Sequence, residues 1–180
     1  MEVNIIEKAM RVAAKGHEGQ MRKEEAIPYL SHPASVAIKL AKHGFPDIVI
    51  AAALVHDVLE DTGMTREEFR TKLGEEVLVI VEQLSEDKSL PWEDRKMRYI
   101  ETIGKADETV KAVSIGDKIH NAESMLIAYG IQKDELWKLF TRGKEKQLWF
   151  MREMLTMFER TWKHPLVDEY RMLVERVSRL

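Results

Sequence analysis

A histidine and an aspartate stand side by side at the end of an apolar run in the first third of the chain. His56 and Asp57 directly follow the apolar residues 51–55. The carboxylates Glu60 and Asp61 come one helical turn later. Burying that many ionisable groups is costly unless something pairs with them, and imidazole and carboxylate groups are common ligands of divalent metal ions. The stretch therefore indicates a metal site, with a polar, solvated helix end as the alternative interpretation.

The spacing of these four residues predicts two different roles. Residues four apart lie on the same face of a helix, so a helix through this stretch places Glu60 next to His56 and Asp61 next to Asp57. The histidine and the aspartate could then bind a metal. The two later carboxylates could reach a water on that metal, or a substrate.

Two other segments carry side chains of the same kind. His32 stands directly before Pro33, where a loop is expected to lead into a helix, and it could project into a cleft or simply cap the helix. Asp117 follows Gly116 in an apolar helical stretch, with Asn121 on the same face four residues later. A glycine there would let another group approach the helix backbone closely. The alternative for Asp117 is a buried ion pair with a nearby lysine or arginine.

Taken together, these segments offer two histidines and two aspartates as candidate metal ligands: His32, His56, Asp57 and Asp117. Such a set suits manganese, iron, zinc or a magnesium-like ion, with positions left open for water and substrate. The chain contains no cysteine, which excludes disulfides and thiolate metal sites. The donor types alone do not choose among these metals.

Composition limits the classes of function that the chain can have. Its 180 residues predict one domain, and a net charge of −3 argues against a general nucleic-acid-binding surface. The N-terminus has no signal-peptide pattern, and no apolar stretch approaches the roughly 20 residues needed to cross a bilayer. We therefore expect a cytoplasmic protein without a membrane or nucleic-acid partner.

Hydrophobic periodicity predicts an all-α fold of about nine or ten helices and no sheet. Gly16, Pro46 and the capping-box pattern from Thr65 to Glu68 mark helix ends. The expected helices cover 4–15, 33–43, 47–60, 65–74, 75–84, 91–103, 108–128, 132–142, 144–162 and 165–179. Apolar residues in the last third predict packing against the rest of the domain, with a homodimer surface as the alternative.

The order of these residues resembles the HD superfamily of metal-dependent phosphohydrolases. More narrowly, it resembles the hydrolase domain of the RelA/SpoT enzymes and the stand-alone small alarmone hydrolases. The resemblance covers roughly residues 5–130 and leaves 131–180 as a helical C-terminal extension packed on the same domain. It is carried by the stretches 17–23, 28–33, 56–62, 86–91 and 116–121.

The resemblance implies a role for each matched residue. In that family the metal is usually Mn²⁺, and the matching ligands here are His32, His56, Asp57 and Asp117. Glu60 and Asp61 match the catalytic pair that acts with the metal-bound water. Residues expected to bind a nucleotide substrate are Arg22, Lys23, Asn121 and Ser124. The family reaction removes pyrophosphate from the 3′ position of guanosine tetra- or pentaphosphate.

Two other functions remain open at this point. The same metal centre could serve a different nucleotide phosphohydrolase, such as a nucleoside monophosphate or NADPH phosphatase, or the chain could be a catalytically silent nucleotide-binding module. Glu123 stands where the family often has a basic residue, and its charge would disfavour a polyphosphate if it pointed inward. His17 and His120 are expected to serve packing, with His120 directed away from the face that Asp117 and Asn121 share.

Overall fold

The chain folds entirely from helices in the part that the structure, a computed structural model, describes: residues 3–23 and 26–180. These ranges contain ten α-helices and one 3-10 helix, and their β-type pairing is limited to a single bridge between Met21 and Pro28. The prediction of an all-α fold is confirmed. No helix in the described ranges is long and apolar enough to cross a membrane.

The N-terminal part is built around one very apolar helix, α3 (Asp47–Val55). Every residue of α3 from Val49 to Val55 is buried, which explains why this run shows no amphipathic pattern. Helix α3 packs against α1 (Ile5–Gly16), α2 (Ser31–Lys42) and α6 (Glu75–Leu84). The short helix α5 (Arg66–Leu73) lies against α1 and α6 and begins with the expected capping box at Thr65.

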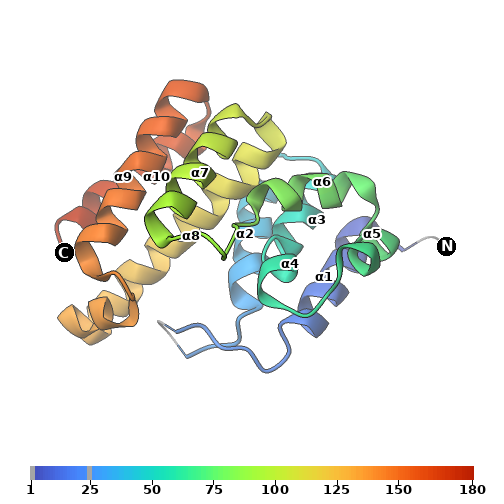
Figure 1. The fold of residues 1–180 in the computed structure, drawn as a ribbon, viewed down its shortest axis with the longest axis horizontal. Coiled ribbons are helices and arrows are strands. Elements are labelled where there is room, and N and C mark those ends of the chain that lie inside the picture. Colours follow the sequence, from blue (N-terminus) through green and yellow to red (C-terminus); the bar gives the residue numbers. More distant parts are fainter. Residues whose placement is uncertain (1–2, 24–25) are drawn as a thin grey trace.

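The long helix α8 (Glu108–Gln132) connects the two ends of the molecule. It contacts α2, α3 and α6 on one side and α10 (Pro165–Ser178) on the other. Helix α7 (Trp92–Lys105) lies between α6 and α9 (Gly143–Thr161), so the last helices cover the end of the molecule opposite α1 and α5 (Figure 1). The buried apolar side chains form one continuous core from Ala9 to Val177.

The expected helix over 47–60 is interrupted at the two residues that carry the chemistry. Helix α3 ends at Val55, His56 and Asp57 form a turn, and the short helix α4 follows (Val58–Asp61). The His56 imidazole Nδ1 lies 2.8 Å from the carbonyl oxygen of Ala53. That carbonyl is the acceptor that the amide of Asp57 would use in an uninterrupted helix. The side chain therefore competes with the backbone ladder, and a continuous helix was the wrong prediction here.

The structure also differs from the helices that were expected over 108–128 and 132–142. Helix α8 continues through Gly130 to Gln132, and η1, a 3-10 helix (Lys133–Leu139), replaces the helix expected over 132–142. A helical glycine costs roughly 1 kcal/mol relative to alanine. Packing of α8 against α10 and η1 offsets that cost.

Gly116 lies where α2 crosses α8. A Cβ atom at this position would lie 3.0 Å from Val36 Cγ1 and 3.4 Å from Leu40 Cδ2, both on α2. The missing side chain therefore lets α2 approach α8 closely, as the sequence suggested. The approach brings His32, at the start of α2, next to Asp117.

Candidate active site

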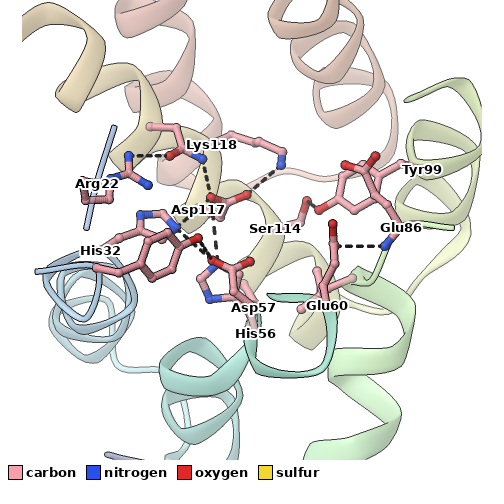
Figure 2. Close-up of a pocket in the computed structure, with 14 residues that line it drawn as sticks. Arg22, His32, His56, Asp57, Glu60, Glu86, Tyr99, Ser114, Asp117 and Lys118 are labelled. Carbon is pink, nitrogen blue, oxygen red and sulfur yellow. Dashed lines mark hydrogen bonds and ion pairs between the residues drawn. The ribbon is translucent and has the colours of Figure 1, made fainter. Parts of the chain in front are cut away.

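The four expected ligands converge at the crossing of α2, α8 and the turn after α3 (Figure 2). One ligand atom from each of His32, His56 and Asp57 lies within 4.8 Å of the others. Asp117 approaches from α8, with its Oδ1 atom 3.2 Å from His32 Nε2 and 3.9 Å from His56 Nε2. Three separated segments thus place nitrogen and oxygen donors around one point.

His56 presents a buried nitrogen suited to a metal. Because the Ala53 carbonyl can only accept a hydrogen bond, His56 Nδ1 carries the proton and Nε2 carries the lone pair. Nε2 is buried, has no hydrogen-bond partner of good geometry, and lies 3.2 Å from Asp57 Oδ2. An unsatisfied lone pair beside a carboxylate oxygen fits a bound cation.

His32 is held by a second imidazole. Its Nδ1 lies 2.8 Å from Nδ1 of His120, while its Nε2 lies 3.7 Å from Asp57 Oδ2. Burial, together with the nearby His32 ring, lowers the pKa of His120 to about 4. Burial also lowers the pKa of His32. Both rings are therefore neutral near pH 7, as a metal-binding imidazole must be.

Three hydrogen-bond donors, the side chains of Tyr29, Lys118 and Asn121, hold the two aspartates in place. The Tyr29 hydroxyl donates to Asp57 Oδ2 at 2.7 Å, and Lys118 Nζ donates to Asp117 Oδ2 at 2.6 Å. The Asn121 amide donates to Asp117 Oδ1. Asp117 is therefore both a candidate ligand and the buried ion-pair partner that the alternative interpretation proposed.

The pKa shifts of these groups follow from their partners. Burial alone would raise the pKa of Asp117, but the Lys118 ammonium and the His32 ring hold it well below the usual value. Burial would likewise raise the pKa of Asp57, yet His56 and His32 bring it below the usual value. The site therefore holds two ionised carboxylates beside the His32 and His56 rings, an arrangement that favours a cation.

Glu60 and Asp61 occupy different environments. Glu60 lines the cavity of about 180 Å³ that the ligands border, and its Oε2 accepts from the backbone N–H of Glu86 at 3.2 Å. Burial raises the pKa of Glu60. The Asp61 side chain does not line this cavity and instead accepts from Lys88 Nζ at 2.8 Å. These adjacent residues of α4 therefore face different surroundings, although Lys88 Nζ also lies 3.5 Å from Glu60 Oε1.

Only two of the four residues expected to bind substrate, Arg22 and Asn121, line the cavity. Arg22 is buried, lines the cavity and donates to Asn121 Oδ1 at 3.0 Å, with its guanidinium carbon 5.8 Å from the centre of the Tyr29 ring. Lys23 is exposed, and Ser124 is buried outside the residues that line the cavity. The structure thus brings Arg22 and Asn121 to the site and leaves the other two apart from its walls.

Glu123 points away from this cavity. Its carboxylate lies 3.0 Å from Lys39 Nζ on α2, and the same ammonium lies 2.5 Å from Glu169 on α10. The Glu123 carboxylate is therefore paired with Lys39 outside the cavity and does not face a polyphosphate bound there. Glu123, which departs from the family pattern, thus takes part in an ion-pair cluster that joins α2, α8 and α10.

Sequence reasoning missed three side chains that contact the ligands, Tyr29, Lys118 and His120, and the Glu86 backbone amide that contacts Glu60. Two signals were available for them. His120 stands three residues after Asp117, so the two share a helix face, and the expectation that it points away was wrong because its ring contacts His32. Tyr29 lies in the matched stretch 28–33. No pattern in the sequence indicated the backbone contact between Glu86 and Glu60.

A second cavity of about 240 Å³ adjoins the first, and the two share Lys118 and Asn121. Its other walls come from α7 and from the C-terminal helices, with Trp92, Phe140 and Phe150 among them. Lys96 Nζ lies 4.6 Å from the centre of the Phe150 ring. The C-terminal part therefore contributes directly to the space beside the candidate metal site.

Comparison with known proteins agrees with this geometry. Residues 9–137 match the HD domain family. The chain is 37% identical to the guanosine-3′,5′-bis(diphosphate) 3′-pyrophosphohydrolase MESH1 of Xenopus tropicalis, over 67% of this chain and 69% of that protein. It is 38% identical to the human MESH1 protein over 63% of this chain and 65% of that protein. These matches span about two thirds of the length of both relatives.

Solved structures show the same fold. The crystal structure of lmo0812 from Listeria monocytogenes EGD-e aligns with a TM-score of 0.75 and 34% identity, over 85% of this chain and 97% of that one. A metazoan orthologue of SpoT, described as hydrolysing ppGpp, aligns with a TM-score of 0.82 over 100% of this chain and 99% of that one, at 23% identity. The second likeness supports the fold alone. With the family match over residues 9–137 and the MESH1 relatives, the chain belongs to the HD domain family of phosphohydrolases.

Proposed function

We propose that this protein is a Mn²⁺-dependent 3′-pyrophosphohydrolase that converts guanosine 3′,5′-bis(diphosphate) and water to GDP and pyrophosphate. The observation that carries the proposal is the convergence of four donors around the buried, unpartnered Nε2 of His56. The activity printed for the MESH1 relatives supports the choice of substrate.

The ligands that would hold the metal are His32, His56, Asp57 and Asp117. A divalent ion bound there lowers the pKa of a coordinated water and stabilises negative charge on a phosphoryl group. Mn²⁺ accepts mixed nitrogen and oxygen ligands of this kind, and the family resemblance is the reason for choosing it over the other metals that fit.

Glu60 is the residue that we propose as general base. It faces the cavity, and the Glu86 amide fixes one of its oxygens. A pKa raised by burial improves a carboxylate as a proton acceptor near neutral pH. Asp61 contributes by holding Lys88, whose ammonium also lies 3.5 Å from Glu60 Oε1, and this pair places a cation beside the base.

Positive charge and aromatic surface support a nucleotide substrate. Arg22 offers a planar guanidinium next to Asn121, and we propose that both contact the nucleoside, with Lys23 at the rim. Ser124 lies on the same face of α8 as Asn121 and would support this contact from its buried position. The adjoining cavity with Trp92 and Phe150 supplies room for the rest of the molecule.

The experiment is a nucleotide panel assayed with product identification. The purified protein is stripped with chelator, reloaded with Mn²⁺ and offered guanosine tetraphosphate, nucleoside monophosphates and NADPH. We expect GDP and pyrophosphate from guanosine tetraphosphate and no turnover before Mn²⁺ is restored. Orthophosphate from another nucleotide with the alarmone untouched would contradict the substrate, and inactivity on the whole panel despite bound metal would favour a silent binding module.

Three earlier expectations stay predictions. The continuous core supports a single domain over residues 1–180, with 131–180 packed on the family region. A cytoplasmic location and a homodimer rest on the sequence alone. Size-exclusion chromatography with light scattering would test the homodimer.

A further inference from the structure

The two histidine ligands are oriented by different kinds of partner. His56 Nδ1 faces the Ala53 carbonyl, which can only accept a hydrogen bond. His32 Nδ1 faces another imidazole nitrogen, Nδ1 of His120, which can either donate or accept. The tautomer of His56 is therefore set by the backbone, whereas that of His32 depends on a side chain.

The direction of this second hydrogen bond follows from the position of His32 Nε2. That atom lies 3.2 Å from Asp117 Oδ1 and 3.7 Å from Asp57 Oδ2, on the side where the four donors converge. For Nε2 to bind a cation, its lone pair must be free and the proton must sit on Nδ1. His32 Nδ1 then donates, and His120 Nδ1 must be the acceptor.

We propose that His120 is a positioning residue of the metal centre, which selects the metal-binding tautomer of His32 and holds its ring in place. The inference rests on the metal site of the proposed function but not on its substrate. His120 does not line the active-site cavity, so it acts through His32 and not on a reacting group.

The placement of His120 supports this role. It lies on α8 three residues after Asp117, so one helix supplies a ligand and the support for another ligand from α2. The two rings lie 4.9 Å apart, centroid to centroid, at an interplanar angle of 53°. Hydrogen-bond partners of metal-bound histidines typically change metal affinity by about 10–100-fold when they are removed.

Three substitutions at one position separate the hydrogen bond from simple packing. In His120→Asn, the side-chain oxygen can stand where Nδ1 stands and can accept the same hydrogen bond. In His120→Gln, the amide is moved one carbon further from the backbone, and in His120→Leu the acceptor is removed. The measurement is Mn²⁺ affinity by isothermal titration calorimetry on chelator-stripped protein, with circular dichroism to confirm that each variant is folded.

We expect the Leu and Gln variants to bind Mn²⁺ about 10–100-fold more weakly and the Asn variant to bind close to the wild-type affinity. His43→Leu serves as the matched control, because His43 pairs with the ring of His164, away from the active-site cavity, and should leave Mn²⁺ affinity unchanged. Wild-type affinity in the folded Leu variant would overturn the inference. An Asn variant that binds Mn²⁺ as weakly as the Leu variant would also overturn it.

The outcome is distinguishable from failure of the proposed function. If the wild-type protein binds no Mn²⁺, the metal site itself is wrong and both ideas fail. If it binds Mn²⁺ but leaves guanosine tetraphosphate intact, the substrate is wrong while the order of affinities among the His120 variants still tests the positioning role.

Discussion

The turn at His56–Asp57 and helix α8 deliver ligands to the same point in different ways. The turn interrupts a buried helix and presents two adjacent residues, one of which is fixed by a backbone carbonyl. Helix α8 stays regular and presents Asp117, which Lys118 and Asn121 hold in place. His56 is thus fixed by the backbone of its own segment, whereas Asp117 is held by two side chains of α8, the adjacent Lys118 and Asn121 one turn later.

This difference explains how each region responds to change. Substitutions near the turn should mainly affect metal binding and catalysis, because its ligands are held partly by the backbone. Substitutions in α8 should affect folding as well, because Asp117 is paired with a buried ammonium. Variants of the turn and of α8 should therefore differ in whether metal binding or stability suffers more.

Glu60→Gln is the sharpest test of the turn and of α4. Loss of the general base should reduce kcat by about 10²–10⁴-fold while Mn²⁺ affinity stays unchanged. Because burial raises the pKa of Glu60, activity should fall as the pH drops through that raised pKa, at a higher pH than for an ordinary glutamate. Asp61→Asn is the control, and its loss should be smaller because Asp61 faces Lys88. Equal losses would mean that the two carboxylates share the role.

Asp117→Ala tests α8, and its main effect should appear in stability. The substitution leaves the mostly buried Lys118 ammonium without its carboxylate partner, and the cost should approach the roughly 3–5 kcal/mol that is typical of a fully buried pair. Urea unfolding of the metal-free protein measures the change in the free energy of unfolding. The double variant Asp117→Ala/Lys118→Met should recover part of the loss. Unchanged stability in the single variant would show that the ion pair contributes little.

Asp57→Ala is the counterpart at the turn. It should abolish measurable Mn²⁺ binding in calorimetry yet destabilise the metal-free protein less than Asp117→Ala, because no buried ammonium is left unpaired. The lost partner is the Tyr29 hydroxyl, and an unsatisfied buried hydroxyl costs about 1–3 kcal/mol. A larger loss of stability than in Asp117→Ala would reverse the comparison.

Tyr29→Phe removes only the hydrogen bond to Asp57 Oδ2. Burial and the Asp57 carboxylate raise the pKa of Tyr29, so the phenol keeps its proton and donates. Mn²⁺ affinity should fall by about 10-fold, which is the smallest effect usually seen when a metal ligand loses its hydrogen-bond partner. Tyr129→Phe, whose hydroxyl contacts the Leu180 carbonyl, should leave the affinity at the wild-type value. Equal affinities for the two variants would contradict a role for Tyr29.

Gly116→Ala and Gly130→Ala form a matched pair within α8. Both gain about 1 kcal/mol of helix propensity, but only position 116 forces Val36 and Leu40 of α2 to move. Overpacking costs about 1–3 kcal/mol, so Gly116→Ala should be neutral or destabilising and should weaken Mn²⁺ binding by shifting His32. Gly130→Ala should raise the melting temperature slightly. A stabilised Gly116→Ala with unchanged affinity would show that α2 can adjust.

Much of the fold and part of the candidate site could be predicted from the sequence. Helix ends at Gly16, Pro46 and Thr65 follow from local backbone chemistry, so their positions were predictable to within one or two residues. The break after Val55 was not, because it depends on the side chain of His56 taking the carbonyl of Ala53. Hydrophobic periodicity contains no information about that competition.

The helical class, the donor types and the order of the candidate ligands could all be predicted before the fold was known. These follow from residue chemistry and from spacing along one chain. The folded structure was needed to show that Glu60 and Asp61 face different partners, that Glu123 pairs with Lys39 and that His120 contacts His32. The last two contacts join residues far apart in the chain, and the first depends on which loop lies next to α4. Such contacts depend on how the helices cross, which spacing along the sequence does not encode.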